Sequence, residues 1–178
     1  MPVEANSVNA VSYEPGQTVI YPHHGACVVD GIVSREVGGE TTDYLVLRAT
    51  AGDLKVSVPV DRADQLGLRP PVSGDELEGL VELLQKTDVR MPSNWSRRLK
   101  NHQEKLKSGD VYQVAEVVRN LALRRRSTEL SVAEREMFAH ARTNLVNELA
   151  PSLEMSIEDA GEYLDAVLRG EDVERTAA

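Results

Sequence analysis

The sequence predicts an α+β fold, in which a small N-terminal all-β domain precedes a C-terminal bundle of about five helices. Short runs rich in Val, Ile, Leu and Tyr, separated by glycine-containing turns, fill the first half of the chain. Helix start signals and apolar residues spaced three and four apart fill the second half. Two prolines and two glycines in residues 67–74 (GLRPPVSG) break regular structure and place the domain boundary there.

Four strands are predicted in the first half, and their short connections imply an antiparallel meander. Leu54, Val56 and Val58 alternate with Lys55 and Ser57, which predicts one buried and one exposed face. Strands at this spacing form a small barrel or a strongly curved sheet. The predicted strands are residues 17–22, 26–37, 41–49 and 54–60.

Five helices are predicted in the second half, each with its own start signal. Ser73 with Glu76, and Ser131 with Glu134, match the capping box, in which a serine and a glutamate three residues later bond each other's backbone N–H. The other expected N-caps are Ser93, Asp110 and Ser156, and the expected stops are Gly109 and Gly170. The predicted helices are residues 74–86, 94–107, 111–126, 132–149 and 157–169. Their short links imply antiparallel neighbours in a compact bundle.

Two of these helices carry the clearest apolar stripes, which we expect to form the core of the bundle. The stripes are Val111, Val114, Ala115, Val118 and Ala122 on one helix, and Phe138, Ala141, Leu145 and Leu149 on the other.

Composition excludes several classes of protein. The 178 residues are 41% apolar and 28% charged, and no apolar run approaches the roughly 20 residues that cross a bilayer. The N-terminal residues lack a signal-peptide pattern, so we expect a cytoplasmic protein without membrane contact. Cys27 is the single cysteine and the chain has four histidines, which argues against an internal disulfide and a cysteine-based zinc cage.

The net charge of −9 conceals a strong segregation of charge along the chain. Residues 1–89 hold 6 Lys/Arg against 14 Asp/Glu, and residues 127–178 hold 4 against 12. Residues 90–126 hold 10 against 3, a balance of +7. This basic segment can face an anion, while the acidic flanks weaken any unaided binding to DNA.

The residues that suit catalysis or metal binding are sparse. His23, His24 and Cys27 are donor types for zinc or copper, but adjacent residues at a strand end point to opposite sides, so a simple turn is favoured. No phosphate-binding glycine loop, serine nucleophile elbow or HExxH motif is present. We therefore predict no enzyme activity, no cofactor and no metal, with a metal hydrolase as a distant alternative.

Trp95, the single tryptophan, lies in the first turn of the most basic predicted helix and has two interpretations. A stripe of Trp95, Leu99, His102 and Leu106 at spacings of 4, 3 and 4 is typical of a buried face, and spacing alone favours this. Alternatively, an aromatic ring beside several cations can act as a wedge between DNA bases while the cations hold phosphates. The neighbouring cations are Arg97, Arg98 and Lys100.

The chain resembles the short form of the CarD family of bacterial RNA polymerase-binding transcription regulators. The motifs are YPHHGACVVDGI and TTDYLVLRATAGDLKVSVPV in the first half, then NWSRRLKNHQEKLKSGDVYQVAEVVRNL and LSVAEREMFAHARTNLVNELA. The resemblance spans residues 14–168, and the block from NWSRR to AEVVR is its most specific part.

The resemblance implies a Tudor-like domain over residues 14–68 that binds the RNA polymerase β subunit, and a helical domain over residues 74–170 that contacts promoter DNA. Residues 1–13 and 171–178 are expected to be a disordered extension and tail. The resemblance makes Trp95 a minor-groove wedge at the upstream edge of the transcription bubble, and adds Arg97, Arg98 and Lys100 as DNA contacts. It also implies polymerase contacts at Arg35 and Val37, and at Ser57, where some relatives carry arginine.

The resemblance therefore implies a regulator that stabilises the promoter open complex without base-specific readout, and that associates with the nucleoid through the polymerase. We expect a monomer whose binding to free DNA is weak. The alternative from the residues themselves is a protein–protein adaptor of the transcription machinery, with Trp95 buried and no direct DNA contact.

Overall fold

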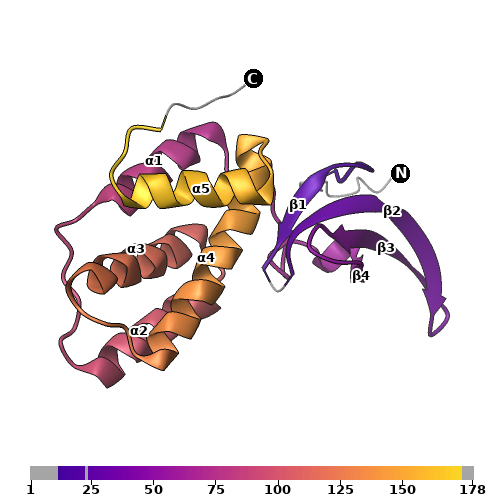
Figure 1. Ribbon diagram of the computed structural model, residues 1–178. Helices are drawn as coiled ribbons and strands as arrows, with labels where there is room; N and C mark the ends of the chain where they lie inside the picture. The colour runs from indigo at the N-terminus through magenta and orange to yellow at the C-terminus, as the bar shows by residue number, and fades with distance from the viewer. Residues whose placement is uncertain (1–11, 23, 174–178) are drawn as a thin grey trace, which may run out of the picture.

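The computed structural model describes residues 12–22 and 24–173 and confirms the α+β fold. A four-stranded sheet from the first half of the chain stands beside a bundle of five α-helices from the second half (Figure 1). Each part has its own hydrophobic core, with Leu68 in the core of the sheet and Val72 in the core of the bundle.

The sheet is an antiparallel meander in the order β1-β2-β3-β4, curved into a half-barrel. Its strands are β1 (Thr18–Tyr21), β2 (Gly25–Val37), β3 (Glu40–Ala49) and β4 (Lys55–Pro59), followed by a short 3₁₀ helix, η1 (Val60–Arg62). The register of β2 on β3 shifts between Val29 and Gly31, a bulge that adds curvature to the long strand. Beyond the bulge the two strands continue as a hairpin that projects from the core and ends at the Val37–Glu40 pair.

The inner face of the sheet is almost completely buried. Its core residues include Val19, Cys27, Val29, Leu45, Leu47 and Val58. The predicted burial of Leu54 is wrong, since this side chain is 49% exposed. Leu54 immediately precedes β4, and its carbonyl accepts a 2.9 Å hydrogen bond from the N–H of Ala49 in β3, so its side chain lies at the edge of the sheet and outside the buried core.

The helices begin and end close to the predicted positions. They are α1 (Gly74–Gln85), α2 (Trp95–Lys107), α3 (Val111–Ser127), α4 (Val132–Leu153) and α5 (Ile157–Leu168). Both predicted capping boxes are present, and Asp110 and Ser156 cap α3 and α5. Ser93 is not the cap of α2: Asn94 has that position, and its Oδ1 accepts a 3.0 Å hydrogen bond from the N–H of Arg97.

The core of the bundle confirms the two predicted stripes, all of whose residues are buried, with further leucines and valines from α1 and α5. Helix α4 is four residues longer than predicted and includes Pro151 in its last turn. It ends at Leu153, where the C-cap Glu154 has a left-handed backbone (φ 54°). A proline so near the C-terminus removes one hydrogen bond without breaking the helix. No helix in the described part of the chain is long and apolar enough to span a membrane.

The two domains meet through the segment that links them. Arg69 extends the sheet edge by exchanging two backbone hydrogen bonds with Ile20 (2.7 and 3.1 Å), and its side chain forms a 2.5 Å ion pair with Glu148 of α4. Pro22 packs so closely against Gly67 and Gly109 that a Cβ on either glycine would lie 3.0 or 3.4 Å from its ring. The junction is therefore a packed contact between linker, sheet and bundle.

The outer ends of the described chain depart from the expected disorder. Residues 1–11 and 174–178 lie outside the described residues. Tyr13, assigned to the extension, is instead 8% exposed in the sheet core, with its hydroxyl 3.3 Å from Asp64. Val173, assigned to the tail, packs against the core of the bundle, and the backbone carbonyl of Glu171 accepts a hydrogen bond from Gln85. Apolar burial explains why these positions are ordered.

Candidate nucleic-acid interface

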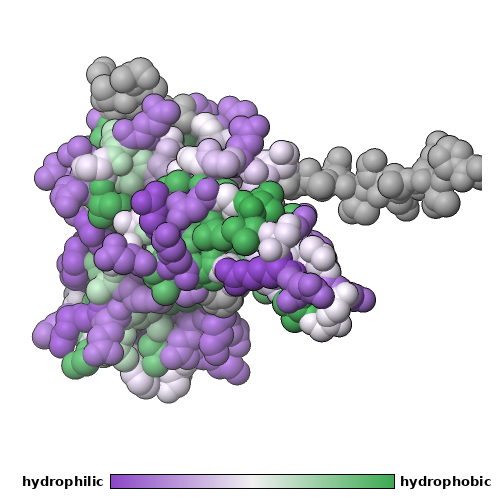
Figure 2. Space-filling model, turned by 90° about the vertical axis from the view of Figure 1, so that its right-hand side faces the viewer, coloured by the Kyte–Doolittle hydropathy of each residue, from purple (hydrophilic) through white to green (hydrophobic). Residues whose placement is uncertain are grey.

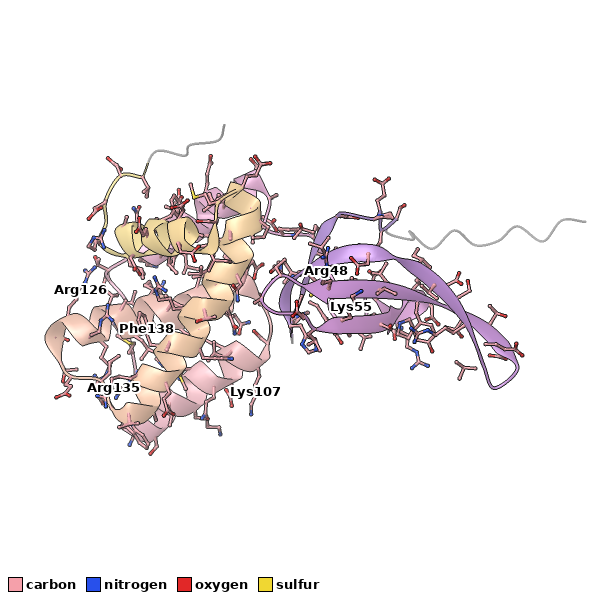
Figure 3. The ribbon with its side chains drawn as sticks, turned by 45° about the vertical axis from the view of Figure 1, so that its right-hand side comes forward. Arg48, Lys55, Lys107, Arg126, Arg135 and Phe138 are labelled. Atoms are coloured by element: carbon pink, nitrogen blue, oxygen red, sulfur yellow. The ribbon has the colours of Figure 1, made fainter. Side chains whose placement is uncertain are left out.

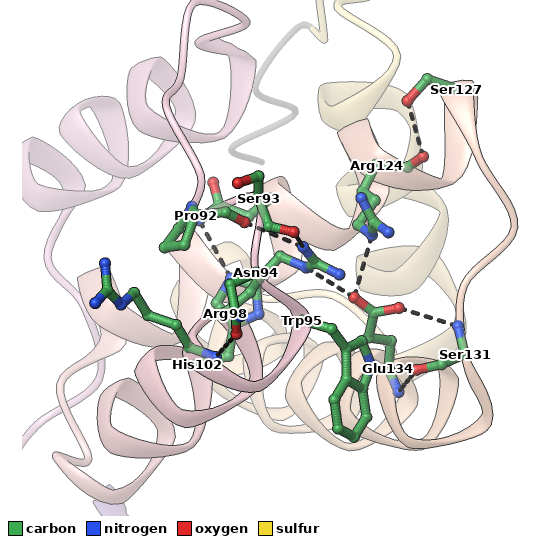
Figure 4. Close-up of polar contacts among 12 residues, drawn as sticks. Pro92, Ser93, Asn94, Trp95, Arg98, His102, Arg124, Ser127, Ser131 and Glu134 are labelled. Carbon is green, nitrogen blue, oxygen red and sulfur yellow. Dashed lines mark hydrogen bonds and ion pairs between the residues drawn. The ribbon is translucent and has the colours of Figure 1, made fainter.

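Trp95 is the first residue of α2 and projects from the bundle surface. Its side chain is 46% exposed, and its indole Nε1 donates a 3.2 Å hydrogen bond to Oγ of Ser131, the N-cap of α4 (Figure 4). This one bond fixes the polar edge of the ring while much of its surface remains open to solvent. The adaptor alternative assumed a buried Trp95, and the exposure contradicts that assumption.

A buried carboxylate, Glu134, supports the position of Trp95. Glu134 is 2% exposed and accepts hydrogen bonds from Arg98 Nε (2.9 Å), Arg124 Nε (3.1 Å) and the N–H of Ser131 (3.0 Å). Burial acts to raise the pKa of Glu134, but the hydrogen bonds from Ser131 and Arg98 outweigh it and lower the pKa. Ser131 therefore joins the carboxylate cluster on one side and the indole on the other.

Arg98 differs from its expected place on a DNA-contacting surface. The residue is 3% exposed, and besides Glu134 its guanidinium donates to the backbone carbonyls of Pro92 (3.1 Å) and Ser93 (3.3 Å). A side chain with these partners is not available to a phosphate in this structure. Arg98 instead holds the segment that leads into α2, and so fixes where Trp95 begins the helix.

Arg97 and Lys100 are exposed on α2, close in sequence to Trp95. Within the described residues, neither side chain is engaged in an ion pair. The N-termini of α2 and α4 also meet at the Trp95–Ser131 contact, and each carries a partial positive charge. The surface around the indole thus offers an anion two cations that have no ion pair within the described residues, while Asn94 and Ser131 cap the two helix N-termini.

A polar layer lies beneath this surface, between α2 and α3. His102 is 3% exposed, its Nε2 lies 3.5 Å from Nδ2 of Asn120, and its Nδ1 has no hydrogen-bond partner within the described structure. Burial is the main reason that the pKa of His102 falls from 6.5 to about 4, and Lys105 and Arg98 add repulsion. His102 is therefore a neutral core residue at pH 7, and it anchors the inner face of α2.

The predicted polymerase-facing residues lie together on the outer face of the sheet. Arg35 Nη2 lies 3.5 Å from Ser57 Oγ, and its guanidinium lies 5.5 Å from the centre of the Tyr44 ring. Val37, two residues further along β2, shares this face and is exposed. Figure 2, which turns the sheet toward the viewer, shows hydrophobic side chains gathered at the surface between charged ones.

The described residues contain no group of three or more histidine, cysteine or acidic side chains suited to a metal ion. Cys27 is buried, and burial raises the pKa of its thiol, so it is packed as a small apolar residue. His23 lies outside the described residues.

Two supporting residues were missed as parts of the site. Ser131 and Glu134 are visible in the sequence as a capping box, but that motif does not reveal that the serine also accepts from an indole 36 residues earlier. A buried glutamate is rare unless paired, and the two arginines that pair with Glu134 here are Arg98 and Arg124, which lie 36 and 10 residues away in the sequence.

Family models match both domains of this chain. The model described as the CarD-like/TRCF RID domain matches residues 13–72, and the model described as the C-terminal domain of CarD matches residues 79–165. The "Putative transcription factor YdeB" of Bacillus subtilis (strain 168) is 27% identical over 137 residues, which cover 77% of this chain and 90% of that protein.

A Tudor-like half-barrel joined to a helical bundle, with both domains matched, defines a two-domain transcription regulator. The first domain is of a kind that interacts with RNA polymerase. The chain belongs to the CarD family.

Proposed function

We propose that this protein binds the β subunit of RNA polymerase through its sheet domain and stabilises the promoter open complex through its helical domain. Trp95 enters the minor groove at the upstream edge of the bubble, and Arg97 and Lys100 contact the flanking phosphates. The recognition is of DNA shape and charge, without base-specific readout. Arg98 has no part in the DNA contact and acts by positioning the start of α2.

The observation that carries this proposal is the exposed, tethered indole. The ring is 46% exposed and therefore accessible to a partner, and its Nε1–Ser131 bond restricts the orientations that it samples. Restriction before binding lowers the entropy lost when the ring is inserted. The free cations on the same helix suit the phosphates that flank an insertion site.

The energetics require the polymerase as well as the DNA. Unstacking a base step costs on the order of a few kcal/mol, and least where the duplex is already distorted, as at the edge of a bubble. With a net charge of −9, the free protein repels DNA and binds it weakly. Docking on the polymerase makes the DNA contact intramolecular, at an effective concentration on the order of millimolar.

The outer face of the sheet supplies the proposed polymerase contact. Arg35, Val37 and Ser57 present a cation, an apolar side chain and a hydroxyl on one surface. The hydrogen bond between Arg35 and Ser57 is long, at 3.5 Å, so the guanidinium is free to turn toward an acceptor on the β subunit.

Site-specific photocrosslinking tests the proposal. Trp95 is replaced by the photoreactive p-benzoylphenylalanine in the full chain, which is then irradiated in complexes of polymerase with promoter DNA. We expect crosslinks to DNA at the upstream edge of the bubble in open complexes, and far fewer with closed complexes or free DNA.

A matched control carries the same photoreactive residue at Ile157, an exposed apolar position in the first turn of α5. It is expected to give no crosslink at the bubble edge. Crosslinks from position 95 to polymerase alone would reject the wedge and leave the polymerase contact intact.

A further inference from the structure

A cavity on another face of the bundle gathers four arginines. It has a volume of about 350 Å³, and Arg125, Arg126, Arg142 and Arg169 line it together with Phe138 and Asp165. The volume is within the range of small-ligand sites. In Figure 3, Arg126 lies at the end of the bundle remote from the sheet, with Phe138 on the adjacent helix α4.

The cavity is positively charged although it lies partly in an acidic region of the sequence. Residues 127–178 hold 4 Lys/Arg against 12 Asp/Glu, yet two of those four, Arg142 and Arg169, point to this cavity. The last turn of α3 adds Arg125 and Arg126, which belong to the basic middle segment of the sequence. Asp165 in the lining and Glu171, which pairs with Arg169, leave an excess of two positive charges.

Two of the guanidiniums are hydrogen-bonded to the protein, Arg142 through three bonds and Arg126 through one. Arg142 makes two hydrogen bonds to Asp165 (3.0 and 2.8 Å) and one to the carbonyl of Gly161 (3.2 Å). A Cβ at Gly161 would lie 3.2 Å from Arg142 Nη2, so glycine makes room for the guanidinium there. Arg126 donates to the carbonyl of Leu168 at the end of α5. The remaining N–H groups of these side chains are thus pre-positioned.

Arg125 is placed differently. Its guanidinium lies 4.9 Å from the centre of the Phe138 ring, and within the described residues it has no hydrogen-bond partner. Arg125 is exposed, so its N–H groups are available to a ligand while the guanidinium stays over the ring. An arginine plane of this kind can stack on a planar ring or bind phosphate bidentately.

We propose that this cavity binds a small phosphorylated ligand of the nucleoside diphosphate class. Arg126 and Arg142 hold the phosphates, and Arg125 offers both donors and a stacking surface. Guanidiniums fixed before binding lose little entropy on contact with phosphate. The proposal is independent of the DNA contact of Trp95, because it uses other side chains and another face of the bundle.

Isothermal titration of the full-length protein with ADP, inorganic pyrophosphate and sulfate, at constant ionic strength, tests this proposal. We expect saturable binding of ADP and pyrophosphate, and weaker binding of sulfate. Arg125→Gln, which removes no hydrogen bond of the fold, should weaken the affinity for ADP by about tenfold. Arg135→Gln is the matched control, since Arg135 is an exposed arginine of α4 outside the cavity lining, and it should leave that affinity unchanged.

Three outcomes would overturn the proposal. One is the absence of saturable ADP binding up to about 10 mM, the limit of a useful specific contact. Another is an equal loss in Arg125→Gln and Arg135→Gln, which indicates general charge attraction. The third comes from duplex DNA added as a further arm: DNA binding that falls in Arg125→Gln without any ADP binding would assign the arginines to a nucleic-acid backbone.

Discussion

Arg97 and Arg98 are neighbours in the sequence with opposite environments. Arg97 is exposed and has no ion pair within the described residues, whereas Arg98 is buried against Glu134. A buried ion pair stabilises a fold only when all its partners are present, and removal of one partner leaves an uncompensated charge. Replacement of Arg98 should therefore lower the free energy of unfolding much more than replacement of Arg97.

Arg98→Met should lower the free energy of unfolding by about 2–3 kcal/mol, because Glu134 loses its closest cation and keeps only Arg124 as a charged partner. Arg97→Met is the matched control and should change stability by less than about 0.5 kcal/mol. Urea unfolding followed by circular dichroism measures both. Equal stability of the two variants would contradict the buried network that we describe.

His102 links stability to pH. Its pKa is about 4 in the folded protein and 6.5 when unperturbed, so the unfolded chain binds the proton more readily between these values. The contribution of neutral His102 to the free energy of unfolding is fully present above pH 6.5 and declines as the pH falls toward 4.

Between pH 7 and pH 5 this effect amounts to about 2 kcal/mol. His102→Gln should abolish that part of the pH dependence in urea unfolding experiments. His140→Gln, on the exposed side of α4, should keep it. If the free energy of unfolding of His102→Gln still changed with pH as it does in the wild type, other groups would be responsible for the pH dependence.

Helix α2 combines two faces with separate tasks. Arg98 and His102 anchor its inner face, and Trp95, Arg97 and Lys100 are exposed. Its N-terminal end is the part nearest the proposed DNA, so cations there should matter more than cations at its C-terminal end. Lys107, in the last turn, provides the comparison (Figure 3).

Arg97→Gln combined with Lys100→Gln should remove two phosphate contacts. The log-log salt dependence of half-maximal open-complex stabilisation should then become shallower by about 1.8. Lys107→Gln should leave the slope unchanged. If Lys107→Gln, which removes one charge, changed the slope by half as much as the double variant, the position of the cations would not matter and the proposed phosphate contacts would be rejected.

The elements of this fold were largely predictable because their signals are local. Capping boxes, N-cap residues and glycine stops lie within a few residues of the helix ends that they determine.

The exposure of Trp95 was not predictable from its helical stripe. Spacing alone favoured a buried ring, but Arg98 and His102 occupy the inner face of α2 and leave Trp95 outside. Helical spacing shows which residues share a face and does not show where the neighbouring helix ends.

At the scale of the whole molecule, the junction determines how the two proposed binding surfaces are arranged. The Arg69–Glu148 ion pair and the packing of Pro22 join linker, sheet and bundle. A cavity of about 570 Å³ lies beside this junction, so the contact is not packed throughout. Glu148 is 8% exposed, and this burial raises the pKa of its carboxyl despite the ion pair with Arg69.

Contacts between distant parts of the chain could not be predicted from the sequence. The ion pair of Arg69 with Glu148, the bond of Trp95 to Ser131 and the arginine-lined cavity each join residues far apart in the chain. The cavity is the clearest case, because its cations come partly from the most acidic third of the sequence. Only the packing of three helices brings these charges together.

The lifetime of the promoter open complex is the most direct test of the central claim that Trp95 stabilises melted DNA. With the polymerase saturated by protein, Trp95→Ala should shorten the lifetime by up to about tenfold relative to wild type. A loss of about 1.4 kcal/mol in the preference of the protein for the open over the closed complex corresponds to that factor. Ile157→Ala should have no effect. A wild-type lifetime in Trp95→Ala, with polymerase binding unchanged, would contradict the account.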